Sequence, residues 1–204
     1  MHLSYRFSIL PALLVAVAAS GQISDGGLPP SLNPNFSSVF LAAPPPIPLA
    51  SLDVNKYFAE DSKQPETIRF AAPLPELDID PTKAGQWTKL PNGDRVWRCA
   101  IQSPNALGLL LIFDQFQLAP GSKFFAYTPN HKEILGAYTQ KSCLPSGQFL
   151  IGILPGDQAV IELWEPAAAL GQSIIHLNRV DYVYDPAGML PAAEAPDDFG
   201  QSYA

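Results

Sequence analysis

Three histidines and a scatter of serines are the residues of this chain whose chemistry could support hydrolysis. Such a reaction needs a nucleophile, a base and an orienting acid in one place. His131 lies in the turn-like run TPNHKE, where a solvated polar residue is expected. His176 lies in SIIHLNRV, where strand alternation places it on the same face as Ile174 and Val180. We expect His176 to be a structural or exposed residue, and the alternative is a base that works with a nearby carboxylate.

Serines and carboxylates add no recognisable catalytic or metal-binding pattern. The chain has no G-x-S-x-G elbow, and turn chemistry explains Ser146 in PSGQF. Two carboxylate pairs lack the spacing and the glycine of an EF-hand-like calcium loop. They are Asp78 with Asp80 in LDIDP and Asp197 with Asp198 in APDDFG. We therefore predict solvated acidic side chains at both places, and no catalytic, metal-binding or cofactor-binding residue in this chain.

The two cysteines, Cys99 and Cys143, could form a disulfide in an oxidising compartment. Two buried free thiols are the alternative, because cysteine packs well as a small apolar residue. Two cysteines and three scattered histidines give no zinc-binding spacing. The sequence leaves the disulfide and the free thiols open.

Aromatic residues could build a core or line a surface that binds sugar or peptide. A β-domain needs aromatic side chains in its interior, so the core is the expected place for most of them. The expected core residues are Trp97, Phe113, Phe116, Phe125, Phe149, Ile161 and Trp164. Tyr182 and Tyr184 alternate in DYVYDP near the end of the last expected strand, and we predict that they form a partner-binding surface.

The charge and the N-terminal segment indicate the environment of the chain. A formal net charge of −7 over 204 residues, with no basic run, disfavours nucleic acid as a partner. Residues 1–21 resemble a signal peptide, because Arg6 precedes an apolar run that ends in small residues. That run is about a dozen residues long and contains Pro11, whereas a membrane anchor, the alternative, needs ~20 residues. We predict cleavage before Gln22 and a secreted or periplasmic protein with no membrane segment after cleavage.

Residues 22–84 form an expected Pro-rich arm. The runs GGLPPSLNPNF and LAAPPPIPLASL favour extended, polyproline-like conformations. Asp53 could cap a short helix that carries Val54, Tyr57 and Phe58 on one side. TIRFA is a candidate strand. We expect this arm to lie over the domain that follows.

From residue 85 the pattern changes to alternating strands and tight turns. DRVWRCAI places Trp97, Cys99 and Ile101 on one face, and several similar runs follow it. Runs such as LPNGD and LPGDQ between them are typical of turns. This pattern predicts an all-β fold, an antiparallel β-sandwich or jelly roll of about seven to eight strands over residues 85–184. Residues 185–204, rich in acid, Pro and Ala, are an expected tail or linker.

Five motifs occur in a fixed order between residues 85 and 162: GQW, NGDRVWR, FDQFQLAPG, ILGAYT and PGDQAVIE. They resemble the N-terminal pro-region of secreted bacterial trypsin-like serine endopeptidases of the lysyl endopeptidase type. The similarity covers most of residues 52–184 and implies a β-sandwich behind a signal peptide and a variable arm. The chain departs from the family at its last strand, where VDYVYDP lacks the histidine that family members carry.

The resemblance also implies a function. Family members continue through a Cys-rich connection into a protease domain with the catalytic His, Asp and Ser, and those residues have no positions in this chain. The expectation is a non-catalytic pro-domain that assists folding of a downstream serine protease domain, inhibits it, or both. The alternatives are a stand-alone secreted module that binds carbohydrate or a cell-surface polymer, and an enzyme that uses His176.

Overall fold

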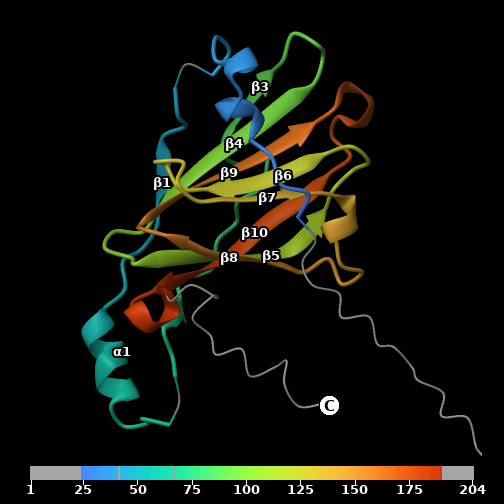
Figure 1. Cartoon of the computed structure of the whole chain (residues 1–204). Helices are drawn as coiled ribbons and strands as arrows, with labels where there is room; N and C mark the ends of the chain where they lie inside the picture. The colour runs from blue at the N-terminus through green and yellow to red at the C-terminus, as the bar shows by residue number, and fades with distance from the viewer. Residues whose placement is uncertain (1–23, 41, 67, 190–204) are drawn as a thin grey trace, which may run out of the picture.

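The computed structural model describes residues 24–40, 42–66 and 68–189, which form two β-sheets and one α-helix (Figure 1). The predicted signal peptide, residues 1–21, lies outside the described residues, as does most of the predicted tail. The described part of the chain contains a six-stranded and a four-stranded sheet, which confirms the all-β sandwich. Strands β3 to β10 lie within residues 85–184, where the sequence predicts seven to eight strands.

Sheet A has six strands. Five of them follow the order β1-β4-β9-β6-β7, and β3 pairs with the first half of β4. All neighbours in this sheet are antiparallel except β1 and β4, which are parallel. The strands are β1 (Pro46–Pro48), β3 (Gln86–Lys89), β4 (Arg95–Gln102), β6 (Lys123–Tyr127), β7 (Ile134–Tyr138) and β9 (Gln158–Glu165).

Sheet B has four antiparallel strands in the order β2-β10-β5-β8. They are β2 (Ala71–Pro73), β5 (Gly108–Gln117), β8 (Phe149–Pro155) and β10 (Ile174–Val183). Short 3₁₀ turns lie outside the sheets: η1 (Pro30–Leu32), η2 (Pro34–Phe36), η3 (Gln140–Ser142), η4 (Ala167–Ala169) and η5 (Pro186–Met189).

The turns between strands follow the glycines of the sequence. In the β3–β4 hairpin the Leu90 N–H donates to the Asp94 carbonyl (2.9 Å), and Gly93 between them has a φ of 90°. Gly156 in the β8–β9 hairpin has a φ of 95°. Both values lie in the left-handed region that favours glycine, so the LPNGD and LPGDQ runs form the tight turns that the sequence predicts.

The main core lies between the two sheets. Trp97, Cys99 and Ile101 of β4 point inward and are at most 1% exposed, as their alternation predicts. On the sheet B side, Phe116 stacks on Phe149 with ring centroids 4.1 Å apart. Two other members of the predicted core behave differently. Phe125 is buried in a second cluster and Trp164 is half-buried, because both alternate with core residues of their strands and so lie on the other face of sheet A.

Part of the predicted arm belongs to the sandwich itself. β1 joins sheet A and β2 joins sheet B, so the sandwich begins N-terminal to the predicted boundary at residue 85. The predicted short helix is α1 (Val54–Asp61), although the Asp53 side chain makes no capping hydrogen bond. Of the strand expected at TIRFA, residues 68–70 are not in a strand, and only Ala71 belongs to β2. No helix in the described ranges has the length and apolar character of a membrane span.

Candidate functional site

A pocket of about 480 Å³ opens at one end of the sandwich, and we call it the mouth pocket. Residues 78–85 form one side of it, because they cross there from the edge of sheet B to β3 in sheet A. Leu163 and Ile175, which also belong to the core, form an apolar floor. Charged side chains from both sheets surround this floor. A concave site with an apolar floor and convergent polar groups is the usual form of a binding site.

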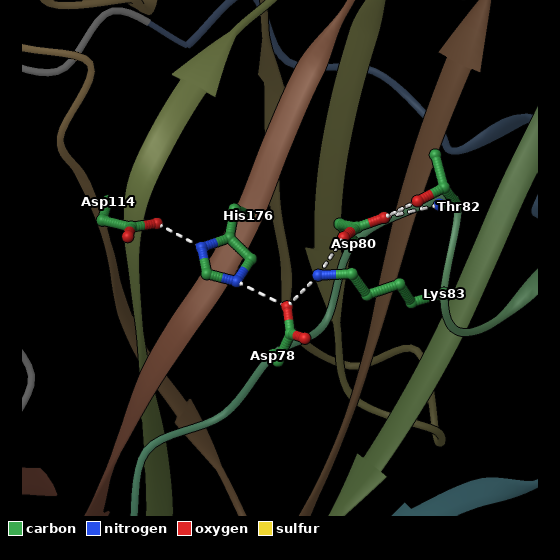
Figure 2. A network of polar contacts seen from close by, with 6 residues as sticks. All are labelled: Asp78, Asp80, Thr82, Lys83, Asp114 and His176. Carbon is green, nitrogen blue, oxygen red and sulfur yellow. Dashed lines mark hydrogen bonds and ion pairs between the residues drawn. The ribbon is translucent and has the colours of Figure 1, made fainter.

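His176 connects two separate parts of the chain at the pocket. Its Nδ1 lies 2.6 Å from Asp114 Oδ1 and its Nε2 lies 3.1 Å from Asp78 Oδ1 (Figure 2). The pairing of β5 with β10 is irregular at this point, because Asp114 and Asn178 have no partner in the ladder. Such bulges redirect side chains. Here the irregularity accompanies a direct contact between Asp114 and His176, which are 62 residues apart in the sequence.

The segment before β3 supplies the rest of this network. A bridge between Ile79 and Leu177 holds the segment against β10 and so places Asp78 beside His176. Lys83 Nζ lies 2.5 Å from Asp78 Oδ1 and 3.2 Å from Asp80 Oδ2 (Figure 2). The hydrogen bond from Lys83 lowers the pKa of Asp78, and the same bond raises the pKa of Lys83.

Asp80 is held mainly by its own turn. Its Oδ1 accepts a hydrogen bond from the Thr82 N–H (2.7 Å) and another from the Thr82 hydroxyl. Burial alone would raise the pKa of Asp80, but the bonds from Thr82 and Lys83 lower it. The predicted carboxylate pair, Asp78 and Asp80, is therefore engaged by basic and hydroxyl groups, although the Asp78 side chain is 62% exposed.

The opposite wall of the pocket is an ion pair stacked on a tryptophan. The Arg95 guanidinium lies 3.8 Å from the ring centre of Trp87 and contacts Glu165 Oε2 through Nη2 at 2.7 Å. The Glu165 side chain is 1% exposed and also accepts the N–H groups of Gly171 (2.9 Å) and Ser173 (3.3 Å). A buried carboxylate needs such partners. The negative charge of Glu165 is therefore compensated by Arg95 and by the two N–H groups.

The contacts of His176 bear on its chemistry. Both ring nitrogens face carboxylates, and within the described ranges neither is hydrogen-bonded to a hydroxyl or a thiol. A neutral imidazole has one N–H and can donate to only one of these carboxylates, whereas a protonated imidazole donates to both. The nearby carboxylate that the enzyme alternative requires is present. His131 lies exposed in its turn, as predicted.

Tyr182 and Tyr184 do not form a surface, so their prediction as a partner-binding surface is wrong. They are 1% and 4% exposed. The Tyr182 hydroxyl donates to the Pro104 carbonyl (3.2 Å), and the Tyr184 hydroxyl lies 2.6 Å from Asp61 Oδ2 at the end of α1. Both rings belong to the main core, and Tyr184 also contacts α1 through Tyr57, whose ring centre is 5.5 Å from that of Tyr184. Burial raises the pKa of Tyr184 to about 12.

Cys99 and Cys143 are free thiols in the structure, and only Cys99 is fully buried, whereas the alternative to a disulfide expected both to be buried. Cys99 lies in the core on β4, and burial raises its pKa to about 11. Cys143 follows η3, where its sulfur accepts the Leu118 N–H at 3.2 Å, and burial raises its pKa as well. Both residues act as small packing groups.

Sequence reasoning missed several members of this site, and three of them show why. Asp114 interrupts the apolar run LLLIFDQF, and a lone carboxylate in a buried strand is a signal that could have identified it. Arg95 and Glu165 begin and end two strands that pair in register, but the sequence does not reveal that register. Within the described ranges no group of His, Cys, Asp and Glu side chains is arranged to hold a metal ion.

No known protein-family model matches this chain, and no solved structure gives a significant match to it.

Proposed function

We propose that this chain is the non-catalytic N-terminal pro-domain of a secreted trypsin-like serine protease precursor, and that the mouth pocket binds a segment of the protease domain. The sequence resemblance supports the kind of partner. Its motifs fall on consecutive parts of one sandwich, with NGDRVWR on the β3–β4 turn and β4, and PGDQAVIE on the β8–β9 turn and β9.

The observation that carries the proposed contact is that the charged groups around the pocket are already paired with one another. Arg95 pairs with Glu165, and Lys83 pairs with Asp78. A pocket in this state keeps its shape without a ligand, and its apolar floor remains available to an incoming side chain. Protein interfaces place anchor side chains in such apolar pockets with polar rims.

A glycan-binding module would use the same pocket in a different way. Sugar recognition commonly combines polar side chains with stacking on an exposed aromatic ring. Trp87 is the aromatic residue at this pocket, and Arg95 covers one side of its ring at 3.8 Å. Trp87 also packs against the main core. The pocket is therefore better suited to an apolar side chain than to the face of a sugar.

The test begins with the reading frame that follows the codon for Ala204, which we expect to encode a domain with a trypsin-like His, Asp and Ser. That domain and residues 22–204 are produced separately and mixed. We expect a stable complex in size-exclusion chromatography, together with inhibition of the protease or faster refolding of it. A stop codon at this place with no cognate protease, or the absence of a complex, would contradict the proposal.

The non-catalytic part of the proposal has its own test. We expect residues 22–204 alone to leave lysyl and arginyl esters intact. Hydrolysis that persists through repurification and disappears in the His176→Ala variant would support the enzyme alternative instead.

A further inference from the structure

One segment of the chain covers the outer face of sheet A, the face turned away from sheet B. This segment, which we call the strap, comprises residues 24–40 and 42–48. At the β7 edge the Asp25 N–H donates to the Ala137 carbonyl (2.9 Å), and the Ala137 N–H donates to the Gly26 carbonyl (3.3 Å). At the opposite edge β1 pairs with β4. Figure 1 shows the strap, in blue, crossing in front of β6 and β9.

The middle of the strap is anchored on a buried carboxylate. Glu162 of β9 is 0% exposed, and its Oε1 accepts the Ser31 N–H at 3.0 Å. Its Oε2 accepts the Ser31 hydroxyl and the Tyr127 hydroxyl, the latter at 2.9 Å. Pro29, two residues before Ser31, is buried, and Leu32 packs against the apolar cluster of this face. The Pro-Pro-Ser-Leu run thus supplies both polar and apolar contacts.

A second anchor lies on the neighbouring strand. Arg98 of β4 stands directly opposite Glu162 in the sheet and is 8% exposed. The two charges form no ion pair with each other. Instead Arg98 Nη2 donates to the carbonyl of Ala42 in the strap (2.9 Å), and the guanidinium lies 4.7 Å from the ring centre of Phe40. Two buried charged side chains therefore bind the main chain of the strap. Glu162 accepts a hydrogen bond from an N–H group, and Arg98 donates one to a carbonyl.

Two further features of the strap lower the cost of replacing it. Arg98 Nε is buried and has no protein partner, so the strap does not satisfy every polar group that it covers. The strap is rich in proline, and Asp25 is its only charged residue. A Pro-rich segment is already extended before it binds, and a nearly neutral one loses little hydration of charges when it binds.

We propose that the outer face of sheet A is a binding site for an extended Pro-Pro-Ser segment, filled by the strap of the same chain and open to exchange with the strap of a second copy. Glu162 recognises the main-chain N–H and the hydroxyl of the serine, and Arg98 recognises a carbonyl further along. Exchange of an identical segment needs no new contacts, because the second strap repeats those of the first. The site shares none of these residues with the mouth pocket and does not depend on the proposed function.

The probe is a fluorescently labelled synthetic peptide with the sequence of residues 24–48, which represents the strap of a second copy. Its binding to full chains is followed by fluorescence anisotropy. In the wild-type chain the tethered strap competes with the peptide at an effective concentration on the mM scale. Ser31→Ala in the chain removes one hydrogen bond to a buried charge and weakens the tethered strap. We expect this variant to bind the peptide about 10- to 100-fold more tightly than the wild type does.

Ser37→Ala is the matched control, because the Ser37 hydroxyl donates to Pro34 within the strap and makes no contact with sheet A. We expect the affinity of this variant for the peptide to equal that of the wild type. Equal affinities for the wild-type and Ser31→Ala chains would overturn the proposal.

A second comparison measures two peptides against one and the same Ser31→Ala chain, so that differences in folding between chains do not enter. A peptide that carries Ser31→Ala is expected to bind the Ser31→Ala chain about 10- to 100-fold more weakly than the unmodified peptide does. Glu162→Ala in the chain should abolish this difference between the two peptides. If the two peptides bind the Ser31→Ala chain equally well, Glu162 does not recognise the serine and the proposal fails.

Discussion

The mouth pocket and the outer face of sheet A both bring charged side chains together, but they satisfy these charges in different ways. Around the pocket, Lys83 pairs with Asp78, and both side chains are more than half exposed. On the outer face, the opposed Glu162 and Arg98 are buried and bind the strap instead of each other. The charged groups at the rim of the pocket thus pair with one another, whereas Glu162 on the outer face is paired with Ser31, which is 131 residues away in sequence.

This difference has an energetic consequence. An exposed ion pair contributes little to stability, because water solvates both partners well without the contact. A buried charge that loses its partner keeps the full cost of its desolvation. Substitutions on the outer face should therefore affect stability much more than substitutions of the exposed residues at the pocket.

The largest effect is expected from Glu162→Ala. It leaves the Tyr127 hydroxyl and the Ser31 N–H without this acceptor and removes the negative charge that interacts at longer range with the buried Arg98. The free energy of unfolding should fall by about 3–5 kcal/mol. Urea denaturation measures it, with Glu133→Ala as the control, because Glu133 is exposed in the β6–β7 turn and should change stability by less than about 0.5 kcal/mol. If both variants lost the same unfolding free energy, the buried charge of the outer face would not matter more for stability than an exposed one.

A smaller effect concerns pH. Burial raises the pKa of Glu162, so between its ordinary pKa and the raised one the folded chain holds a proton there that the unfolded chain releases. The contribution of Glu162 to stability should therefore decrease as the pH rises from the ordinary pKa of 4.5 through the raised value. The titratable or charged side chains that face Glu162 are Tyr127 and Arg98. His131 lies beside the Tyr127 ring.

The matched variant for this pH effect is Glu162→Gln, in which the other groups still titrate. The difference in unfolding free energy, wild type minus variant, is measured by urea denaturation between about pH 4 and 8. We expect this difference to decrease with rising pH. A difference that increases over the same range would show that the hydrogen bonds to the carboxylate outweigh its burial.

The smallest effect on stability is expected for the exposed Lys83 and Asp78 at the pocket. Its dependence on pH has the opposite sign to that of Glu162. The bond from Lys83 lowers the pKa of Asp78, so its contribution is present above the ordinary pKa of 3.8 and is lost as the pH falls through the lowered value. Lys83→Met should leave thermal unfolding at neutral pH close to that of the wild type. A large drop in the unfolding midpoint would mean that this network holds the two sheets together.

The sequence predicts the sandwich because its signals are local. Alternation over DRVWRCAI places Trp97 and Cys99 in the core, and Gly93 has the positive φ that its turn needs. The short helix also follows from a local pattern, since α1 begins directly after Asp53. Each of these features depends on residues within a few positions of one another.

The sites are not predictable in the same way, because they combine distant segments. His176 meets Asp114 through the irregular pairing of β5 with β10, which no short run of sequence specifies. Glu162 points outward, as alternation with Ile161 requires, and is buried only because the strap returns over it. Tyr184 shows the same limit, because its alternation with Tyr182 is local, whereas its burial depends on the core and on α1.

The measurement that tests the central claim most directly is the affinity of the chain for the proposed protease domain when the pocket is altered. Ile174 lines the mouth pocket and is 50% exposed, so Ile174→Asp should weaken the complex at least about tenfold without affecting the fold. Ile68→Asp is the matched control, because Ile68 is 83% exposed and lies outside the pocket. We expect the control to bind as the wild type does. Equal affinities for all three proteins would contradict the assignment of the mouth pocket as the docking site.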